Sequence, residues 1–124
     1  MDTQKKQSIL IVEDEKPLAR VMCLKLNSAG YQTTVCFCGE EALVILAKTS
    51  FDLIILDLLM PKGDGFSVLA HLNTSGIKTP VIVASNLSQE EDIEKAKKLG
   101  AVDYFIKSDV TLVEMVNKVK QYLQ

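Results

Sequence analysis

Five short, mainly apolar runs alternate along the chain with five stretches in which apolar residues recur at helical spacing. The clearest run is Leu53–Leu56, which has four apolar residues in succession and ends on Asp57. A continuous apolar run of this length is typical of a strand buried on both faces, as in a parallel sheet. The pattern predicts strands at residues 8–12, 31–37, 53–56, 80–84 and 102–106.

Each apolar run is followed by a segment that predicts a helix. Pro17 suits the first turn of the first helix, and Gly30 is a natural stop for it. Thr111 and Glu114 have the spacing of a capping box at the start of the last helix. The predicted helices cover residues 17–29, 40–48, 64–73, 88–99 and about 111–123. The fourth helix has the fewest apolar anchors, so we expect it to be the easiest to shift.

The strict alternation of strand and helix predicts an α/β fold with a parallel sheet and helices on both faces. A chain of 124 residues suits a single domain, which we place at residues 1–124. In the doubly wound strand order 2-1-3-4-5, the first and third strands flank the switch point where such folds bind ligands. We therefore predict a five-stranded doubly wound (βα)5 sandwich in this order.

Polar side chains follow four of the five predicted strands. Glu13 and Asp14 follow the first strand, Asp57 the third, Ser85 the fourth and Lys107 the fifth. The strand that lacks such a group is the second, which the predicted order places at the edge of the sheet. Because the carboxyl ends of parallel strands meet at one edge, we expect these five side chains to lie together.

This set suits phosphoryl transfer to a carboxylate. Three carboxylates that lie together repel one another, and a hard cation such as Mg²⁺ relieves the repulsion. Glu13, Asp14 and Asp57, with a backbone carbonyl just after Asp57, offer the oxygen ligands that Mg²⁺ prefers. Asp57 could act as a nucleophile and form an aspartyl phosphate. The Lys107 ammonium and the Ser85 hydroxyl could then neutralise charge on the transferred group.

Each of these residues alone also has an ordinary structural explanation. An acid after a strand is commonly a helix cap, which would account for Asp14 or Asp57 taken singly. Ser85 alone could be a turn residue, and Lys107 alone a solvated charge. The functional interpretation is favoured because four ordinary explanations would otherwise have to coincide at one edge of one sheet.

Composition narrows the classes of function. A net charge of −2 and a pI near 5.4 argue against direct nucleic-acid or membrane binding. The polar start of the chain lacks the apolar centre of a signal peptide, and no apolar run is long enough for a membrane span. The odd number of cysteines, without metal or redox spacing, predicts buried free thiols and a cytoplasmic location.

At these spacings the sequence resembles the receiver domain of bacterial two-component response regulators, over nearly its whole length. The segments that carry the resemblance are 9–14 (ILIVED), 56–61 (LDLLMP) with Asp64-Gly65, 80–85 (PVIVAS) and 100–107 (GAVDYFIK). The resemblance implies a flavodoxin-like fold and a signalling domain rather than an enzyme. It also implies roles: Asp57 as phosphoacceptor, Glu13 and Asp14 as Mg²⁺ ligands, the Leu59 carbonyl as a further ligand, Ser85 as switch hydroxyl, Lys107 as phosphate contact and Tyr104 as switch aromatic.

The family takes its phosphoryl group from a histidine on a sensor kinase or a phosphotransfer protein. In the family, the modified Asp57 would draw Ser85 inward, and Tyr104 would follow into the vacated space. The resemblance implies that this remodels the surface of the fourth helix, fifth strand and fifth helix. That surface would control an output domain or a downstream partner, which includes a second copy of the chain.

The sequence departs from the family pattern at several positions. Ser108 follows Lys107 where most members have proline, so the peptide bond between them could be strained or trans. Asn86 stands where a small residue is usual. Leu59 and Leu87 occupy positions that in the family tune loss of the phosphoryl group. Both are apolar and would not orient a water, so we predict slow self-dephosphorylation.

Two other functions remain to be distinguished. A flavin carrier on the same fold would need a phosphate-binding loop after the first strand, where residues 13–15 are all acidic and would repel it. A receiver-like module that binds partners without phosphorylation would share the fold and the surface. The sequence shows no output domain, and we expect either a stand-alone protein or a piece of a longer regulator.

Overall fold

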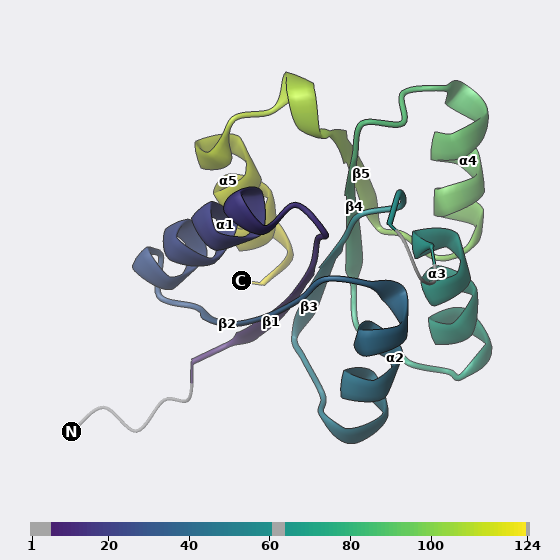
Figure 1. Cartoon of the computed structure of the whole chain (residues 1–124), viewed down its shortest axis with the longest axis horizontal. Coiled ribbons are helices and arrows are strands. Elements are labelled where there is room, and N and C mark those ends of the chain that lie inside the picture. The colour runs from purple at the N-terminus through teal and green to yellow at the C-terminus, as the bar shows by residue number, and fades with distance from the viewer. Residues whose placement is uncertain (1–5, 61–63, 124) are drawn as a thin grey trace.

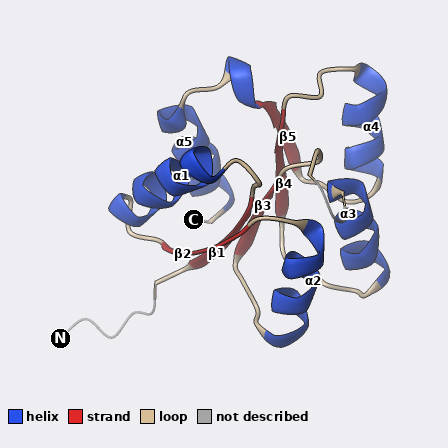
Figure 2. Cartoon of the chain, in the orientation of Figure 1, coloured by secondary structure: helices blue, strands red, loops and turns tan. Residues whose placement is uncertain are grey.

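The computed structural model describes residues 6–60 and 64–123 and shows five strands alternating with five α-helices (Figure 1). A short 3₁₀ helix, η1, lies between the last strand and the last α-helix (Figure 2). In chain order the elements are β1 (Ser8–Val12), α1 (Lys16–Ser28), β2 (Gln32–Cys36), α2 (Gly39–Lys48), β3 (Leu53–Leu56), α3 (Gly65–Thr74), β4 (Val81–Ser85), α4 (Glu90–Lys98), β5 (Asp103–Ile106), η1 (Lys107–Asp109) and α5 (Leu112–Tyr122).

The strands form one parallel sheet in the order β2-β1-β3-β4-β5, which confirms the predicted architecture. Helices α1 and α5 cover one face, and α2, α3 and α4 cover the other (Figure 1). Strand residues alternate between the two layers: Leu10 and Leu56 belong to one buried cluster, and Ile11 and Ile55 to the other. Burial on both faces explains why the sequences of the central strands β1, β3 and β4 are almost continuously apolar.

The predicted element boundaries hold to within two residues at most ends. The capping box at the start of α5 is confirmed, since Thr111 Oγ1 accepts from Glu114 N and the Glu114 side chain accepts from Thr111 N. Helix η1 was not predicted. Its first peptide bond, from Lys107 to Ser108, is trans, as are all peptide bonds of the described residues.

The three cysteines are free thiols, as predicted, but only Cys36 is buried. Cys23 and Cys38 are half-buried, so the prediction of burial is wrong for these two. Cys23 lies on α1 beside Thr33, with 2.8 Å between its sulfur and the Thr33 hydroxyl oxygen. Within residues 6–60 and 64–123, no helix combines the length and apolar content that crossing a membrane requires.

Candidate functional site

The three acids predicted at the sheet edge do come together. Asp57 N donates to the Val12 carbonyl at 3.0 Å, and Glu13 N donates to the Cys36 carbonyl at 3.1 Å. These two bonds extend the strand pairing by one residue and fix the backbone positions of Glu13 and Asp57. One carboxylate oxygen from each of Glu13, Asp14 and Asp57 lies within 4.8 Å of the others. Glu13 is 1% and Asp57 3% exposed, so two of the three carboxylates are almost fully removed from water.

Lys107 reaches into this cluster from the end of β5. Its Nζ donates to Glu13 Oε1 at 2.9 Å and to Asp57 Oδ2 at 3.1 Å, and it lies 3.9 Å from Glu15 Oε1. The ammonium therefore joins the acids of β1 and β3 across the switch point. Charge-assisted hydrogen bonds of this kind are shorter and stronger than neutral ones.

Burial has the largest influence on the pKa values of the two buried acids, Glu13 and Asp57. It raises the pKa of Glu13 to about 7, although the hydrogen bond from Lys107 and the backbone N–H of Glu15 both work to lower it. Burial also raises the pKa of Asp57, against the opposing charge of Lys107. The pKa of Lys107 is raised even though burial works to lower it, because Glu13 and Asp57 favour the charged form.

One ammonium does not compensate three carboxylates. The raised pKa values of Glu13 and Asp57 show that the two buried acids are held in their charged form only at a cost. The three carboxylates offer only oxygen ligands, and these oxygens lie close together. Such an arrangement fits a hard divalent cation. Glu13, Asp14 and Asp57 are therefore residues that could hold Mg²⁺.

Ser85 lies at the end of β4 and is fully buried. Its Oγ accepts a hydrogen bond from Leu87 N at 3.2 Å, and no hydrogen bond joins it to Asp57 in the described part of the chain. Ser85 therefore reaches the predicted edge, but its hydroxyl is engaged with the loop that leads to α4.

Tyr104 projects from β5 toward the same loop. Its hydroxyl donates to the Leu87 carbonyl at 2.7 Å, and its half-buried ring packs against the core cluster that contains Val83. Burial raises the pKa of Tyr104, the nearby Ser85 hydroxyl works to lower it, and the charges of Asp92 and Asp57 raise it further. The ring thus already lies against the β4–α4 loop while Asp57 is unmodified. Tyr104 and Ser85 contact the same residue, Leu87.

The residues just after Asp57 hold its carboxylate from the other side. Leu59 N donates to Asp57 Oδ1 at 3.3 Å, while Leu59 as a whole is 56% exposed. The Leu59 backbone thus lies next to the carboxylate, and its carbonyl as a metal ligand stays a prediction.

Gly65 supports the site, and the sequence alone did not predict this role. A Cβ built on Gly65 would lie 2.3 Å from the Asp57 carbonyl oxygen and 2.6 Å from Leu58 Cα. Gly65 N also donates to the Leu58 carbonyl at 3.0 Å. The first residue of α3 therefore packs directly on the backbone that carries Asp57. The sequence shows a glycine directly after Asp64, but only the close approach of the two backbones explains why a glycine is required there.

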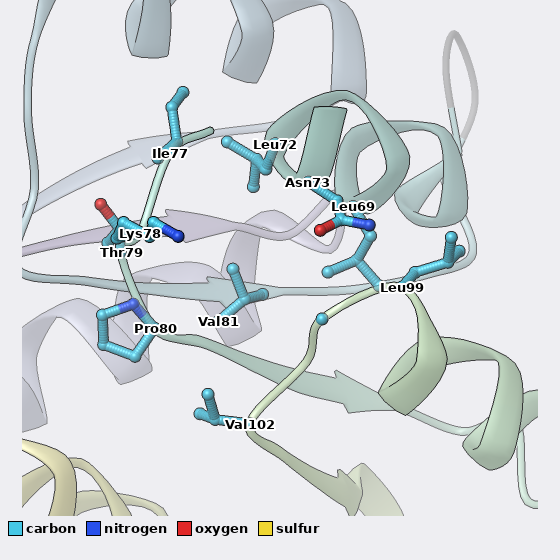
Figure 3. Close-up of a pocket in the computed structure, with 11 residues that line it drawn as sticks. Leu69, Leu72, Asn73, Ile77, Lys78, Thr79, Pro80, Val81, Leu99 and Val102 are labelled. Atoms are coloured by element: carbon cyan, nitrogen blue, oxygen red, sulfur yellow. The ribbon is translucent and has the colours of Figure 1, made fainter. Parts of the chain in front are cut away.

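A separate cavity of about 230 Å³ lies at the opposite edge of the sheet (Figure 3). Pro80 and Val81 line it where β4 begins, and Val102 lines it just before β5. The remaining walls come from α3, from the loop between α3 and β4, and from the segment that follows α4. This cavity contains none of the predicted site residues.

Known protein families and individual proteins resemble this chain over most of its length. A family model described as "response regulator receiver domain" matches residues 9–120. The chain is 36% identical over 99 residues to the transcriptional regulatory protein DltR of Streptococcus agalactiae, covering 80% of this chain and 44% of DltR. It is 36% identical over 118 residues to the transcriptional regulatory protein PcoR of Escherichia coli, covering 95% of this chain and 52% of PcoR. The chain thus spans about half the length of these curated relatives.

Solved structures show the same relationship. The receiver domain of Francisella response regulator 1452 superposes with a TM-score of 0.89 at 33% identity, covering 94% of this chain and 96% of that one. The signal receiver domain of a Luxo repressor protein from Vibrio parahaemolyticus gives a TM-score of 0.90 at 26% identity, covering 96% and 91%. Sequence match, strand order and the acidic sheet edge agree, and the chain belongs to the response regulator receiver domain family of two-component systems.

Proposed function

We propose that Asp57 accepts a phosphoryl group from a phosphohistidine of a sensor kinase or a phosphotransfer protein. The observation that carries the proposal is the position of Asp57: almost fully buried, bonded to the Lys107 ammonium, and within 4.8 Å of two further acids. We interpret this burial and pairing as an arrangement that prepares the Asp57 carboxylate for reaction. Asp57 directly follows β3, whose four residues are all buried.

The transfer itself needs little covalent machinery. An Asp57 carboxylate oxygen forms a bond to phosphorus, the phosphorus–nitrogen bond of the donor breaks, and the histidine nitrogen takes up a proton from solvent. Catalysis then consists of positioning and of charge stabilisation. Lys107, which lies 3.1 Å from Asp57 Oδ2, would contact the transferred group. Ser85 would supply a hydroxyl from the end of the neighbouring strand.

We further propose that Glu13, Asp14, Asp57 and the Leu59 carbonyl hold Mg²⁺. Bound there, the ion neutralises negative charge on the phosphoryl oxygens. The three carboxylates supply the oxygen donors, and their uncompensated charge supplies the driving force for binding. Glu13 is shared between this role and its hydrogen bond to Lys107.

The output of the switch would be the surface formed by α4, β5 and α5. Only Ala96 of α4 is fully buried, so this helix is held by less apolar contact than its neighbours. Ser85 and Tyr104 both contact the loop that leads to α4, through Leu87. On the proposed mechanism, phosphorylation of Asp57 draws the Ser85 hydroxyl toward the phosphoryl group and changes how this loop and α4 are held.

Relatives named as transcriptional regulatory proteins are about twice as long as this chain. We propose that residues 1–124 form one cytoplasmic receiver domain whose switch surface controls an output domain, a separate target or pairing with a second copy. The domain itself would not contact nucleic acid, since its net charge is −2. We also propose that the phosphoryl group is lost slowly without a phosphatase, because Leu59 and Leu87 offer no polar side chain to orient a water.

The test is intact-mass measurement after incubation with acetyl phosphate and Mg²⁺. We expect one added phosphoryl group, which disappears in Asp57→Asn and in the presence of EDTA. Asp52→Asn is the matched control, since Asp52 is exposed just before β3, at the end away from Asp57, and its substitution should leave phosphorylation unchanged. A chain that binds its partners but never gains the phosphoryl mass would instead be a phosphorylation-independent interaction module.

A further inference from the structure

The β4 and β5 strands separate just where the site begins. The last pair in their ladder is Ser85 with Ile106. One step farther, Asn86 Oδ1 accepts a hydrogen bond from Ser108 N at 3.1 Å. Within the described part of the chain, no backbone–backbone hydrogen bond joins residues 86–89 to residues 107–111. Inside the ladder, backbone carbonyls accept the hydrogen bonds between the strands. Just beyond its end, the Asn86 side-chain oxygen takes over this role for Ser108 N.

The segment that this bond holds is the one that carries Lys107. Lys107 lies between Ile106, at the end of the ladder, and Ser108, and it begins η1. Helix η1 has three residues and none of them is buried, so its own packing does little to fix it. The Lys107 ammonium nevertheless has to reach both Glu13 and Asp57.

We propose that Asn86 is a positioning residue, which clips the start of η1 to the β4–α4 loop and so fixes Lys107 beside Asp57. The function of this clip rests on the proposed phosphorylation of Asp57. The chemistry of the pair is specific: the Lys107–Ser108 bond is trans, and Ser108 has a backbone N–H that proline would lack. Asn86 supplies the acceptor for that N–H and joins the segment that follows β4 to the segment that follows β5.

Amide hydrogen exchange measured by NMR on the unphosphorylated chain tests the clip directly. We expect exchange of the Ser108 amide to speed up about two- to tenfold in Asn86→Ala, the range that corresponds to losing one modest hydrogen bond. Asn86→Asp keeps the Oδ1 acceptor and should retain the protection. Ser108→Ala removes only the side-chain hydroxyl, so the backbone amide at position 108 should stay protected as well. Equal exchange in the wild type and in Asn86→Ala would overturn the proposal.

The second measurement is the rate of phosphorylation by acetyl phosphate with saturating Mg²⁺, followed by intact mass. Asn86→Ala should slow it about two- to tenfold if Lys107 loses its support. The decisive comparison is Asn86→Ala in a Ser108→Pro background, which lacks the N–H. There Asn86→Ala should have no further effect, whatever Ser108→Pro itself does.

The outcomes separate this proposal from the proposed function. A loss that is equally large in both backgrounds, or an Asn86→Ala rate that matches the wild type, would overturn the positioning role. If Asn86→Ala acted only by lowering general stability, its unfolding midpoint would fall and it would still slow phosphorylation in the Ser108→Pro background. That outcome would also overturn the positioning role. If the wild type takes no phosphoryl group, the proposed function fails and the positioning role fails with it, while Ser108 amide exchange still decides whether the hydrogen bond exists.

Discussion

Raising the pH from 5 to 8 without divalent cations should destabilise the folded chain. The cause is Glu13, whose pKa burial raises from 4.5 to about 7 in the folded protein. Between these values the unfolded chain has lost the Glu13 proton while the folded chain retains it. The unfolded state therefore binds fewer protons, and the free energy of unfolding falls as the pH rises through this window.

The size of the effect follows from that shift. Each unit of pKa difference corresponds to about 1.4 kcal/mol, and part of the effect lies below pH 5 and above pH 8, so Glu13 should cost about 2–3 kcal/mol across the range. Asp57 acts in the same direction, because burial also raises its pKa. Asp103, whose pKa is lowered although burial opposes this, contributes in a more acidic range. The pKa of Lys107 is raised above 10.5 and stays outside the window.

Urea unfolding followed by far-ultraviolet circular dichroism, at pH 5, 6, 7 and 8 in EDTA, measures this directly. Saturating Mg²⁺ should reverse the loss, since a ligand at a hundredfold excess over its dissociation constant stabilises by about 2.7 kcal/mol. Glu13→Gln should remove the Glu13 contribution to the pH dependence. Glu15→Gln is the matched control, because the Glu15 side chain is 62% exposed and should leave the pH dependence in place. A stability in EDTA that is flat or rises between pH 5 and 8 would refute the reasoning.

Three substitutions test other parts of the structure by urea unfolding. Gly65→Ala should cost more than ~2 kcal/mol, because the new Cβ would lie 2.3 Å from the Asp57 carbonyl oxygen; a cost under about 0.5 kcal/mol would contradict the close approach. Thr111→Ala should cost about 1 kcal/mol by removing the capping box, and Thr111→Ser should recover most of it. Tyr104→Phe should cost about 1 kcal/mol through loss of the hydrogen bond to the Leu87 carbonyl, and unchanged stability would show that this bond contributes nothing.

The sheet and its carboxyl edge could be predicted from the sequence because both follow from short, regular patterns. Short apolar runs such as Leu53–Leu56 are typical of strands buried on both faces, and their alternation with helices predicts a parallel sheet. Once the strand order is set, the residue after each strand must lie at one edge. The meeting of Glu13, Asp57 and Lys107 therefore followed from topology, with no knowledge of side-chain geometry.

The contacts that tune the site could not be predicted, because they depend on loop conformations and rotamers. Nothing in the sequence shows that Lys107 bonds Glu13 as well as Asp57, or that Asn86 accepts from Ser108. The stacking of Lys95 over Phe66, with Nζ 4.3 Å from the ring centroid, depends on how α4 packs against α3. Such contacts are decided by distances of a few tenths of an ångström, whereas sequence patterns fix only which face of an element a residue occupies.

The hydrogen bonds around Leu87 explain how a change at Asp57 could reach α4. Leu87 N donates to Ser85 Oγ, and the Leu87 carbonyl accepts from Tyr104, so the two proposed switch side chains engage the N–H and the carbonyl of one residue. If the Ser85 hydroxyl turns toward a phosphoryl group, Leu87 N loses its acceptor and the residue bonded to Tyr104 is free to move. Each bond is worth about 1 kcal/mol. Couplings of 1–3 kcal/mol are typical of allosteric switches. An energy of that size can shift an α4 that buries only Ala96 completely, whereas it could not move a strand of the sheet.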